Sequence, residues 1–394
     1  MSKELTFLFF ETDRTSMKGA FQIARIFDIP VKIHWSFILI FVWIGSIAYQ
    51  NSDRFNTDQF IWLSIGVFAL FTCVLMHEFG HALTARHFGI GTRDIVLLPI
   101  GGVAMLNKLP NKPFQEFLVA LAGPLVNLGI SMVSMIYILF LSDEKQSDIY
   151  QWMLHLGNPD GNFYIEHITS IDQFFISLIL LNLGVAIFNL LPAFPMDGGR
   201  IFRALLSMRM KRVSATRIAT YLGQLLALIL FIFSIVQFNF LAAFVSVFVF
   251  VTAMNEYRAI KQEYVLDHFS VQQIFRPDFT EIYETDGLDC ALSKSEESGE
   301  KQFLVFDQWH NIKGSLGSEE LKPMKKKNLV TSAGQIMQKG YEVLLPEDPL
   351  KEAFYQLYTN KRGIMPVMVK GKLVGVLDEE TLFQFLDHQI RKMR

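Results

Sequence analysis

The sequence has few cysteines, few charged residues and little excess charge of either sign. Two cysteines among 394 residues exclude a disulfide framework and a thiolate metal site, so any metal ligands must be histidines and carboxylates. Charged residues make up 19% of the chain and the formal net charge is -2. This balance provides no basic surface of the kind that binds nucleic acid, and we expect no nucleic-acid partner.

Apolar residues are abundant instead. Hydrophobic residues make up 51% of the chain and Phe alone occurs 37 times, more than the core of a soluble protein of this size needs. Because a membrane-spanning helix takes about 20 mostly apolar residues, the last apolar run is long enough for two helices, with a turn at 237–239. The sequence therefore predicts a polytopic α-helical membrane protein with six transmembrane helices, from the runs 33–49, 60–88, 117–141, 173–196 and 218–255.

The connections between these runs differ in basic charge. In chain order they carry 5, 1, 4, 1, 6 and 0 lysines plus arginines. Since basic connections stay on the cytoplasmic side, this alternation predicts a multi-pass protein of the cell membrane with both termini in the cytoplasm. The composition becomes that of a soluble protein after Tyr257, which predicts a membrane core at 1–258 and a small cytoplasmic α/β domain at 259–394, with Lys325–Lys327 as a linker.

His77-Glu78-Phe79-Gly80-His81, near the end of the second run, is an HExxH motif. Residues four apart project from one face of a helix, so His77 and His81 can bind one metal ion while Glu78 acts on a metal-bound water. Two histidines and a glutamate in an apolar span are costly unless they are used. The motif predicts a catalytic zinc site.

Such a site needs a third protein ligand. His87 has metzincin spacing, but Thr84 replaces the required glycine, and on a continuous helix His87 lies about 240° around from His81. Asp197 is the better candidate, because prolines and glycines around it allow the chain to bend and the charge count places it on the same side as His77. A plain Asp-Gly-Gly turn is the alternative for Asp197 alone.

These motifs together resemble the site-2 protease family of intramembrane zinc metalloproteases. The resemblance covers about residues 25–258 and includes HEFGH at 77–81, LPIGGVA at 98–104, AGPLVN at 122–127 and NLLPAFPMDGGR at 189–200. It implies a zinc metalloendopeptidase that performs regulated intramembrane proteolysis, cutting a single-span substrate embedded in the lipid bilayer near its cytoplasmic side. It also implies one Zn²⁺ per chain held by His77, His81 and Asp197, with Glu78 as general base and Asn189 binding the oxyanion.

A transmembrane substrate must unwind before its peptide bond can be attacked. The apolar stretch around Gly101, Gly102 and Val103 is the candidate substrate-binding segment, because an exposed strand edge can pair with an extended peptide. A re-entrant turn whose glycines only allow close packing is the alternative, and both stay open.

The tail resembles the CBS module, which usually works in pairs, often dimerises and often binds adenine nucleotides. The resemblance is clearer at 331–390 and degenerate at 265–322. The usual nucleotide-contacting pattern has Thr three and Asp six residues after a glycine, whereas Asp378 and Thr381 follow Gly375 in exchanged order. This departure leaves an adenine nucleotide site, a structural role and a homodimer through the tail all open.

Two other functions compete with the protease. A metal transporter or channel regulated by a CBS-like tail would also place His and Asp in its spans, but it predicts ligands near the bilayer midplane and an internal repeat. Here the candidate ligands lie at span ends and the two halves show no repeat. A non-catalytic pseudoprotease that binds membrane proteins is the second alternative, against which the intact set of His77, Glu78, His81 and Asp197 argues.

Overall fold

The chain divides into two compact units, Met1–Glu256 and Tyr257–Arg394. The computed structural model describes residues 19–50, 55–99, 101–107, 110, 112–154, 170–318, 332–360 and 363–393. The predicted linker Lys325–Lys327 and residues 319–322 of the predicted first CBS half lie outside the described residues, as do several basic residues of the connections.

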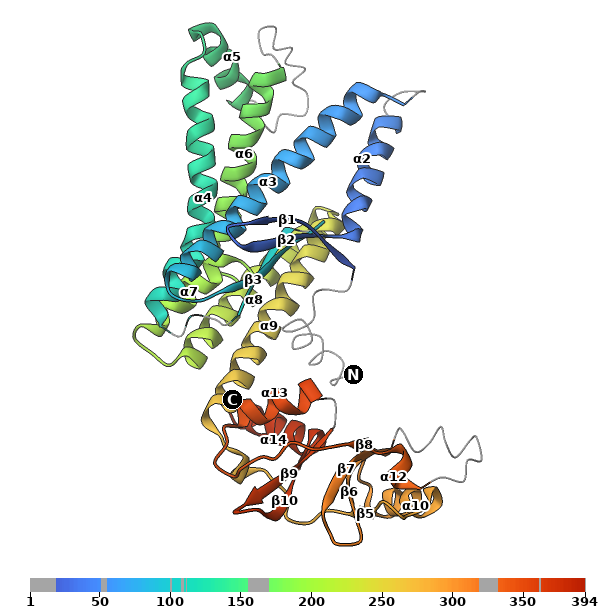
Figure 1. Cartoon of the computed structure of the whole chain (residues 1–394). Helices are drawn as coiled ribbons and strands as arrows, with labels where there is room; N and C mark the ends of the chain where they lie inside the picture. The colour runs from blue at the N-terminus through green and yellow to red at the C-terminus, as the bar shows by residue number, and fades with distance from the viewer. Residues whose placement is uncertain are drawn as a thin grey trace. The chain divides into compact units, whose positions relative to one another are not determined.

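The first unit is built mainly from helices (Figure 1). Five described helices are long and apolar enough to cross a membrane, and residues 35–49 form a shorter apolar helix, so the predicted number of six spans is approximate. The predicted turn at 237–239 does separate two of the helices. Their bounds are α2 (Ile38–Gln50), α3 (Thr57–His87), α4 (Pro113–Leu139), α5 (Asp143–Leu154), α6 (Ser170–Leu190), α7 (Asp197–Ser207), α8 (Arg212–Val236) and α9 (Phe240–His268).

Several predicted spans have different ends in the structure, and the last, α9, continues to His268, well past the predicted end at 255. The first begins later, because residues 33 and 34 belong to a strand and a short 3-10 helix, η1 (Trp35–Phe37), precedes α2. The fourth ends at Leu190 rather than Met196, because Pro192 and Pro195 lack the amide hydrogen that a helix interior needs. The chain therefore turns at 191–196 before α7 begins. The polar helix α5 was not predicted.

A four-stranded sheet belongs to the same unit. Its strands are β1 (Ala20–Ile26), β2 (Ile29–His34), β3 (Thr92–Leu98) and β4 (Gly101–Leu106), in the spatial order β1-β2-β3-β4. β2 and β3 are parallel, and the other two pairs are antiparallel. The sheet packs on α3 through a small apolar core formed by Ile29, Val31, Phe79, Ala82 and Ile95.

The two hairpins of this sheet differ in their sequence signals. The β1–β2 hairpin was not predicted, because Phe27 and Asp28 occupy its turn with φ of 50° and 63°, where Asn-Gly would give the usual signal. The stretch around Gly101 is the β3–β4 hairpin, in which Leu98 pairs with Gly101 and Gly101 has φ of 138°. This stretch forms the strand β4 at an edge of the sheet, and its role in substrate binding stays a prediction.

The second unit is a small α/β domain with two sheets, β5-β6-β7-β8 and β10-β9. The predicted Lys370–Gly371 turn joins its last two strands, and both residues have the positive φ that such a turn requires. Two apolar clusters, around Ile282 and Phe303 and around Leu304 and Val376, form its core. The elements are η2 (Val271–Gln273), β5 (Glu281–Tyr283), α10 (Leu288–Ser298), β6 (Gln302–Phe306), β7 (Ile312–Gly317), α12 (Ala333–Ile336), β8 (Gln338–Lys339), α13 (Leu350–Asn360), β9 (Ile364–Val369), β10 (Lys372–Asp378) and α14 (Glu379–Lys392).

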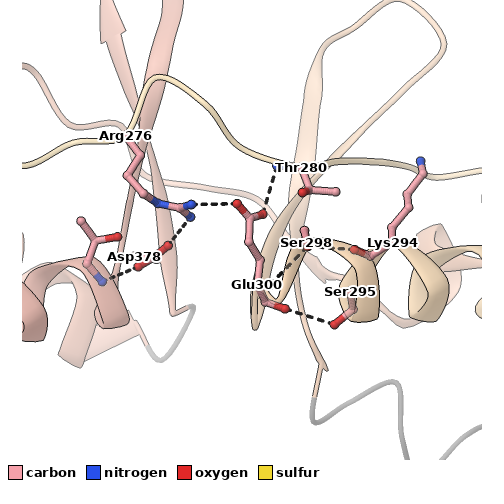
Figure 2. Close-up of polar contacts among 8 residues, drawn as sticks. Arg276, Thr280, Lys294, Ser295, Ser298, Glu300 and Asp378 are labelled. Atoms are coloured by element: carbon pink, nitrogen blue, oxygen red, sulfur yellow. Dashed lines mark hydrogen bonds and ion pairs between the residues drawn. The ribbon is translucent and has the colours of Figure 1, made fainter.

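A polar network joins the two halves of this tail (Figure 2). The backbone of Arg276 exchanges two hydrogen bonds of 2.8 Å with that of Val376 in β10. The guanidinium of Arg276 donates to Asp378 Oδ2 at 2.5 Å and to Glu300 Oε1 at 2.7 Å. Burial acts against the charge of Arg276, but its bonds to Glu300 and Asp378 outweigh this effect and raise its pKa. Asp378 also caps α14 by accepting the Thr381 N–H at 2.7 Å.

Candidate metal centre

Three buried side chains meet between α3 and the start of α7. His77 and His81 come from successive turns of α3, and Asp197 is the first residue of α7. The Nε2 atoms of both histidines lie 3.1 Å from Asp197 Oδ2 and 3.1 Å from each other. The three residues are only 6–7% exposed. Sequence reasoning had selected this set, and the structure brings its ligand atoms together although Asp197 lies 120 residues from His77.

The arrangement fits a zinc ion. Tetrahedral ligands placed ~2.0–2.1 Å from zinc are ~3.3 Å apart, close to the 3.1 Å separations of these atoms. Two imidazoles and a carboxylate are also a donor set that zinc prefers. Among the described residues this is the one group of three or more His, Cys, Asp or Glu side chains close enough to share a metal ion.

Helix α4 contacts both imidazole rings at their Nδ1 atoms. His77 Nδ1 lies 2.8 Å from Asn127 Oδ1, and His81 Nδ1 lies 2.7 Å from the Val119 carbonyl oxygen. Both partners are acceptors, so each Nδ1 carries the hydrogen and each Nε2 presents its lone pair toward Asp197. Such outer partners fix the ring orientation of metal-binding histidines.

Gly123 lies against the same two rings. A Cβ atom at this position would be 2.3 Å from His81 Nε2 and 2.7 Å from His77 Cε1, so a larger residue would occupy the space of the ligand atoms. Sequence reasoning included the 122–127 motif in the resemblance but gave Gly123 and Asn127 no role. Their spacing offered a signal, because Val119, Gly123 and Asn127 are four apart and share one helix face.

Glu78 points toward the edge strand β4. Its Oε2 accepts the Ala104 N–H at 3.0 Å, and a Cβ at Gly102 would lie 2.7 Å from Glu78 Cγ. The predicted substrate segment of Gly101, Gly102 and Val103 therefore runs beside this carboxylate. The side chain of Val103 is 40% exposed.

Asn189 and His87 are not members of the group of metal-binding side chains. Asn189 is half-buried in the last turn of α6, and the structure does not bring it into the hydrogen-bonded group around Asp197. His87 ends α3 with its ring against Phe88, in agreement with its exclusion as a ligand.

Comparison with known proteins places this site in a family. Residues 65–233 match peptidase family M50 and residues 333–388 match the CBS domain. Zinc metalloprotease MJ0392 of Methanocaldococcus jannaschii is 34% identical over 262 residues, which cover 66% of this chain and 68% of that protein. The chain belongs to peptidase family M50. The M50 match contains His77, Glu78, His81 and Asp197, and the CBS match lies in the second half of the tail.

Two further relatives of this M50 peptidase cover different shares of the chain. Stage IV sporulation protein FB of Bacillus subtilis is 26% identical over 235 residues, 56% of this chain and 72% of that protein. The solved site-2 protease from Methanocaldococcus jannaschii is 32% identical, covers 60% of this chain and 95% of that chain, and gives a TM-score of 0.40.

Proposed function

We propose that this M50 peptidase is an intramembrane zinc endopeptidase that hydrolyses a peptide bond of a membrane-embedded, single-span substrate. The observation that carries the proposal is the buried triangle of His77 Nε2, His81 Nε2 and Asp197 Oδ2, with 3.1 Å sides, beside Glu78. Membership of a peptidase family and helices long enough to cross a membrane support it over a transporter and over a pseudoprotease.

Each residue has a defined task in this proposal. A zinc ion held by His77, His81 and Asp197 would lower the pKa of a water molecule toward ~7 and polarise the substrate carbonyl. Glu78 takes the proton from the attacking water and returns it to the leaving amine. Asn189 donates to the oxyanion that forms on the carbonyl oxygen.

The edge strand β4 is the proposed substrate-binding element. β4 pairs with β3 on one side, and on the other side the Ala104 N–H donates to Glu78. An extended substrate strand added here would offer its own carbonyl to the Ala104 N–H. Glu78 would then be released at the moment when a substrate is in place, with Gly101, Gly102 and Val103 lying along the bound peptide.

Substitution of Glu78 tests the function. We expect the purified full chain in detergent to cut a single-span model substrate within its span, as mass spectrometry of the products would show. Glu78→Gln should keep one zinc ion per chain and lose at least ~10²-fold in rate, the typical contribution of a positioned acid-base group. Metal that moves across sealed vesicles without any cleavage would favour the transporter. Zinc binding without cleavage of any substrate would favour the pseudoprotease.

For the tail we propose a structural role without a nucleotide. Asp378 is already used twice, as the cap of α14 and as the partner of Arg276. A homodimer formed through the tail remains part of the proposal, and the mass of the detergent-solubilised full chain, compared with a chain ending at residue 258, tests it.

Both termini are proposed to lie in the cytoplasm, because basic residues are concentrated in alternate connections. The two cysteines allow a direct test, since Cys290 in the tail is exposed and Cys73 is buried. We expect a membrane-impermeant maleimide to label Cys290 in inside-out vesicles. Labelling in right-side-out vesicles alone would reverse the proposed topology.

A further inference from the structure

A buried ion-pair cluster lies on α7, the helix that begins with Asp197. Its centre is Arg203, which is 0% exposed and the largest of the fully buried side chains. A charge buried in a unit with membrane-spanning helices is strongly destabilising unless it is paired and hydrogen-bonded. The contacts of Arg203 therefore indicate why the charge is kept there.

Arg203 contacts three different segments. Its Nε donates to Glu116 Oε1 on α4 at 2.7 Å, and its Nη2 lies 2.5 Å from the same oxygen. Its Nη1 donates to Glu256 Oε1 on α9 at 2.8 Å. The guanidinium also lies over the ring of Phe194, 5.1 Å from the centroid, in the turn that leads into α7. Arg212 at the start of α8 completes the cluster, 3.8 Å from Glu116.

The link to α4 matters because α4 also holds the histidines. Glu116 lies about one turn before Val119, whose carbonyl accepts from His81, and Asn127 further along binds His77. Positions 116, 119, 123 and 127 follow one face of the helix. One helix thus contacts both imidazoles and, through the pair of Glu116 and Arg203, the helix that carries Asp197.

The start of α7 is anchored in a different way. A Cβ at Gly198 would lie 2.2 Å from the Leu191 carbonyl oxygen, and one at Gly199 would lie 2.7 Å from the Ala193 carbonyl carbon. The first turn of α7 therefore packs directly on backbone. This contact fixes one point of the helix, and a second fixed point is needed to set the direction of its axis. Arg203 supplies that point about two turns further on.

We propose that Arg203 and Glu116 are positioning residues of the metal site. Their buried ion pair fixes α7 against α4 and thereby sets the Asp197 carboxylate opposite His77 and His81. This inference rests on the proposed function, because it takes these three residues as the zinc ligands.

Zinc affinity tests the proposal without any need for a substrate. The metal-free full chain in detergent would be titrated with Zn²⁺ against a competing chelator, and with Co²⁺ to record the absorption bands that report ligand geometry. We expect Arg203→Lys and Glu116→Gln to fold, to bind zinc ~10 to 100-fold more weakly, as is typical when an outer partner of a metal site is lost, and to shift the Co²⁺ bands.

The pair of Asp172 and Lys145 offers a matched control. Asp172 is 0% exposed and accepts from Lys145 at 2.7 Å and from Tyr137 at 2.9 Å, but it lies in the first turn of α6, at the opposite end from Asn189 and the turn to α7. Asp172→Asn therefore breaks a comparable buried ion pair. We expect it to lower the unfolding temperature and to leave zinc affinity and the Co²⁺ spectrum unchanged.

The zinc titrations distinguish failure of the proposed function from failure of the positioning role. If the unsubstituted chain binds no zinc, the proposed function fails. If it binds zinc, and Arg203→Lys and Glu116→Gln bind it equally well while only losing stability as Asp172→Asn does, the positioning role is overturned. Should Arg203→Lys not fold, Glu116→Gln, which breaks the same ion pair from the α4 side, decides in its place by the same two measurements.

Discussion

At the scale of single residues, the metal site needs a position without a side chain as well as its ligands. Gly123 has no side chain where the rings of His77 and His81 need space. Val119 and Asn127 hold those rings by their Nδ1 atoms. The HExxH spacing revealed the histidines because helix periodicity is a local property. The residues on α4 were given no role because their effect depends on how two distant helices cross.

Gly123→Ala should strongly weaken zinc binding. The new methyl group would overlap His81 Nε2, so the rings must move and the affinity should fall by at least ~100-fold, more than for loss of an outer partner alone. Chelator-competed zinc titration measures this loss. Gly129→Ala on the same helix is the control, because nothing lies within 4 Å of its Cβ position, and it should stabilise α4 by up to ~1 kcal/mol. Equal zinc affinity in both variants would contradict the close packing of Gly123 against the two imidazole rings.

At the scale of elements, the edge strand β4 brings the sheet into contact with Glu78. Its residues 101–103 run beside Glu78, and its Ala104 N–H contacts that carboxylate. The sequence pointed to this stretch through its paired glycines. It gave no sign of the β1–β2 hairpin at the far edge, whose turn residues Phe27 and Asp28 adopt positive φ without the usual turn composition.

Cross-linking should detect an extended substrate at β4. In a Cys290→Ser background, Val103→Cys is expected to form disulfides with substrate cysteines at alternate positions, because side chains of a strand alternate between two faces. Mass spectrometry of the cross-linked peptides gives the period. Ile23→Cys, exposed on β1 at the opposite edge of the sheet, should form none. A period of three to four residues would show that the substrate stays helical and would count against pairing with β4.

At the scale of the whole molecule, a peptidase unit and a CBS tail follow one another along the chain. The second CBS half was visible in the sequence and matches its family at 333–388. The link of Arg276 with Glu300 and Asp378 (Figure 2) was not visible, because Asp378 lies 102 positions from Arg276 in sequence.

Arg276→Met should loosen the tail without any effect on zinc binding. Loss of its charged hydrogen bonds should cost about 1.5–3 kcal/mol, so the amides of β10 and the first turn of α14 should exchange hydrogen ~10 to 100-fold faster by mass spectrometry. Lys301→Met is the control, since its pair with Glu380 is exposed and contributes little. In the unsubstituted chain, added AMP or ATP should slow no exchange in the tail. A saturable slowing would establish a nucleotide site and refute the structural role.

The sequence by itself determined the features that depend on neighbouring residues: the apolar helices, the HExxH face and the Lys370–Gly371 turn. It also selected Asp197, and its role as a ligand stays a prediction together with the roles of Glu78 and Asn189. Only the tertiary structure decided that Asp197 lies against His77 and His81, that α4 contacts both histidines and that Arg203 links α7 to α4. These features arise from contacts between segments up to 120 residues apart, and such contacts form only where packing brings the segments together.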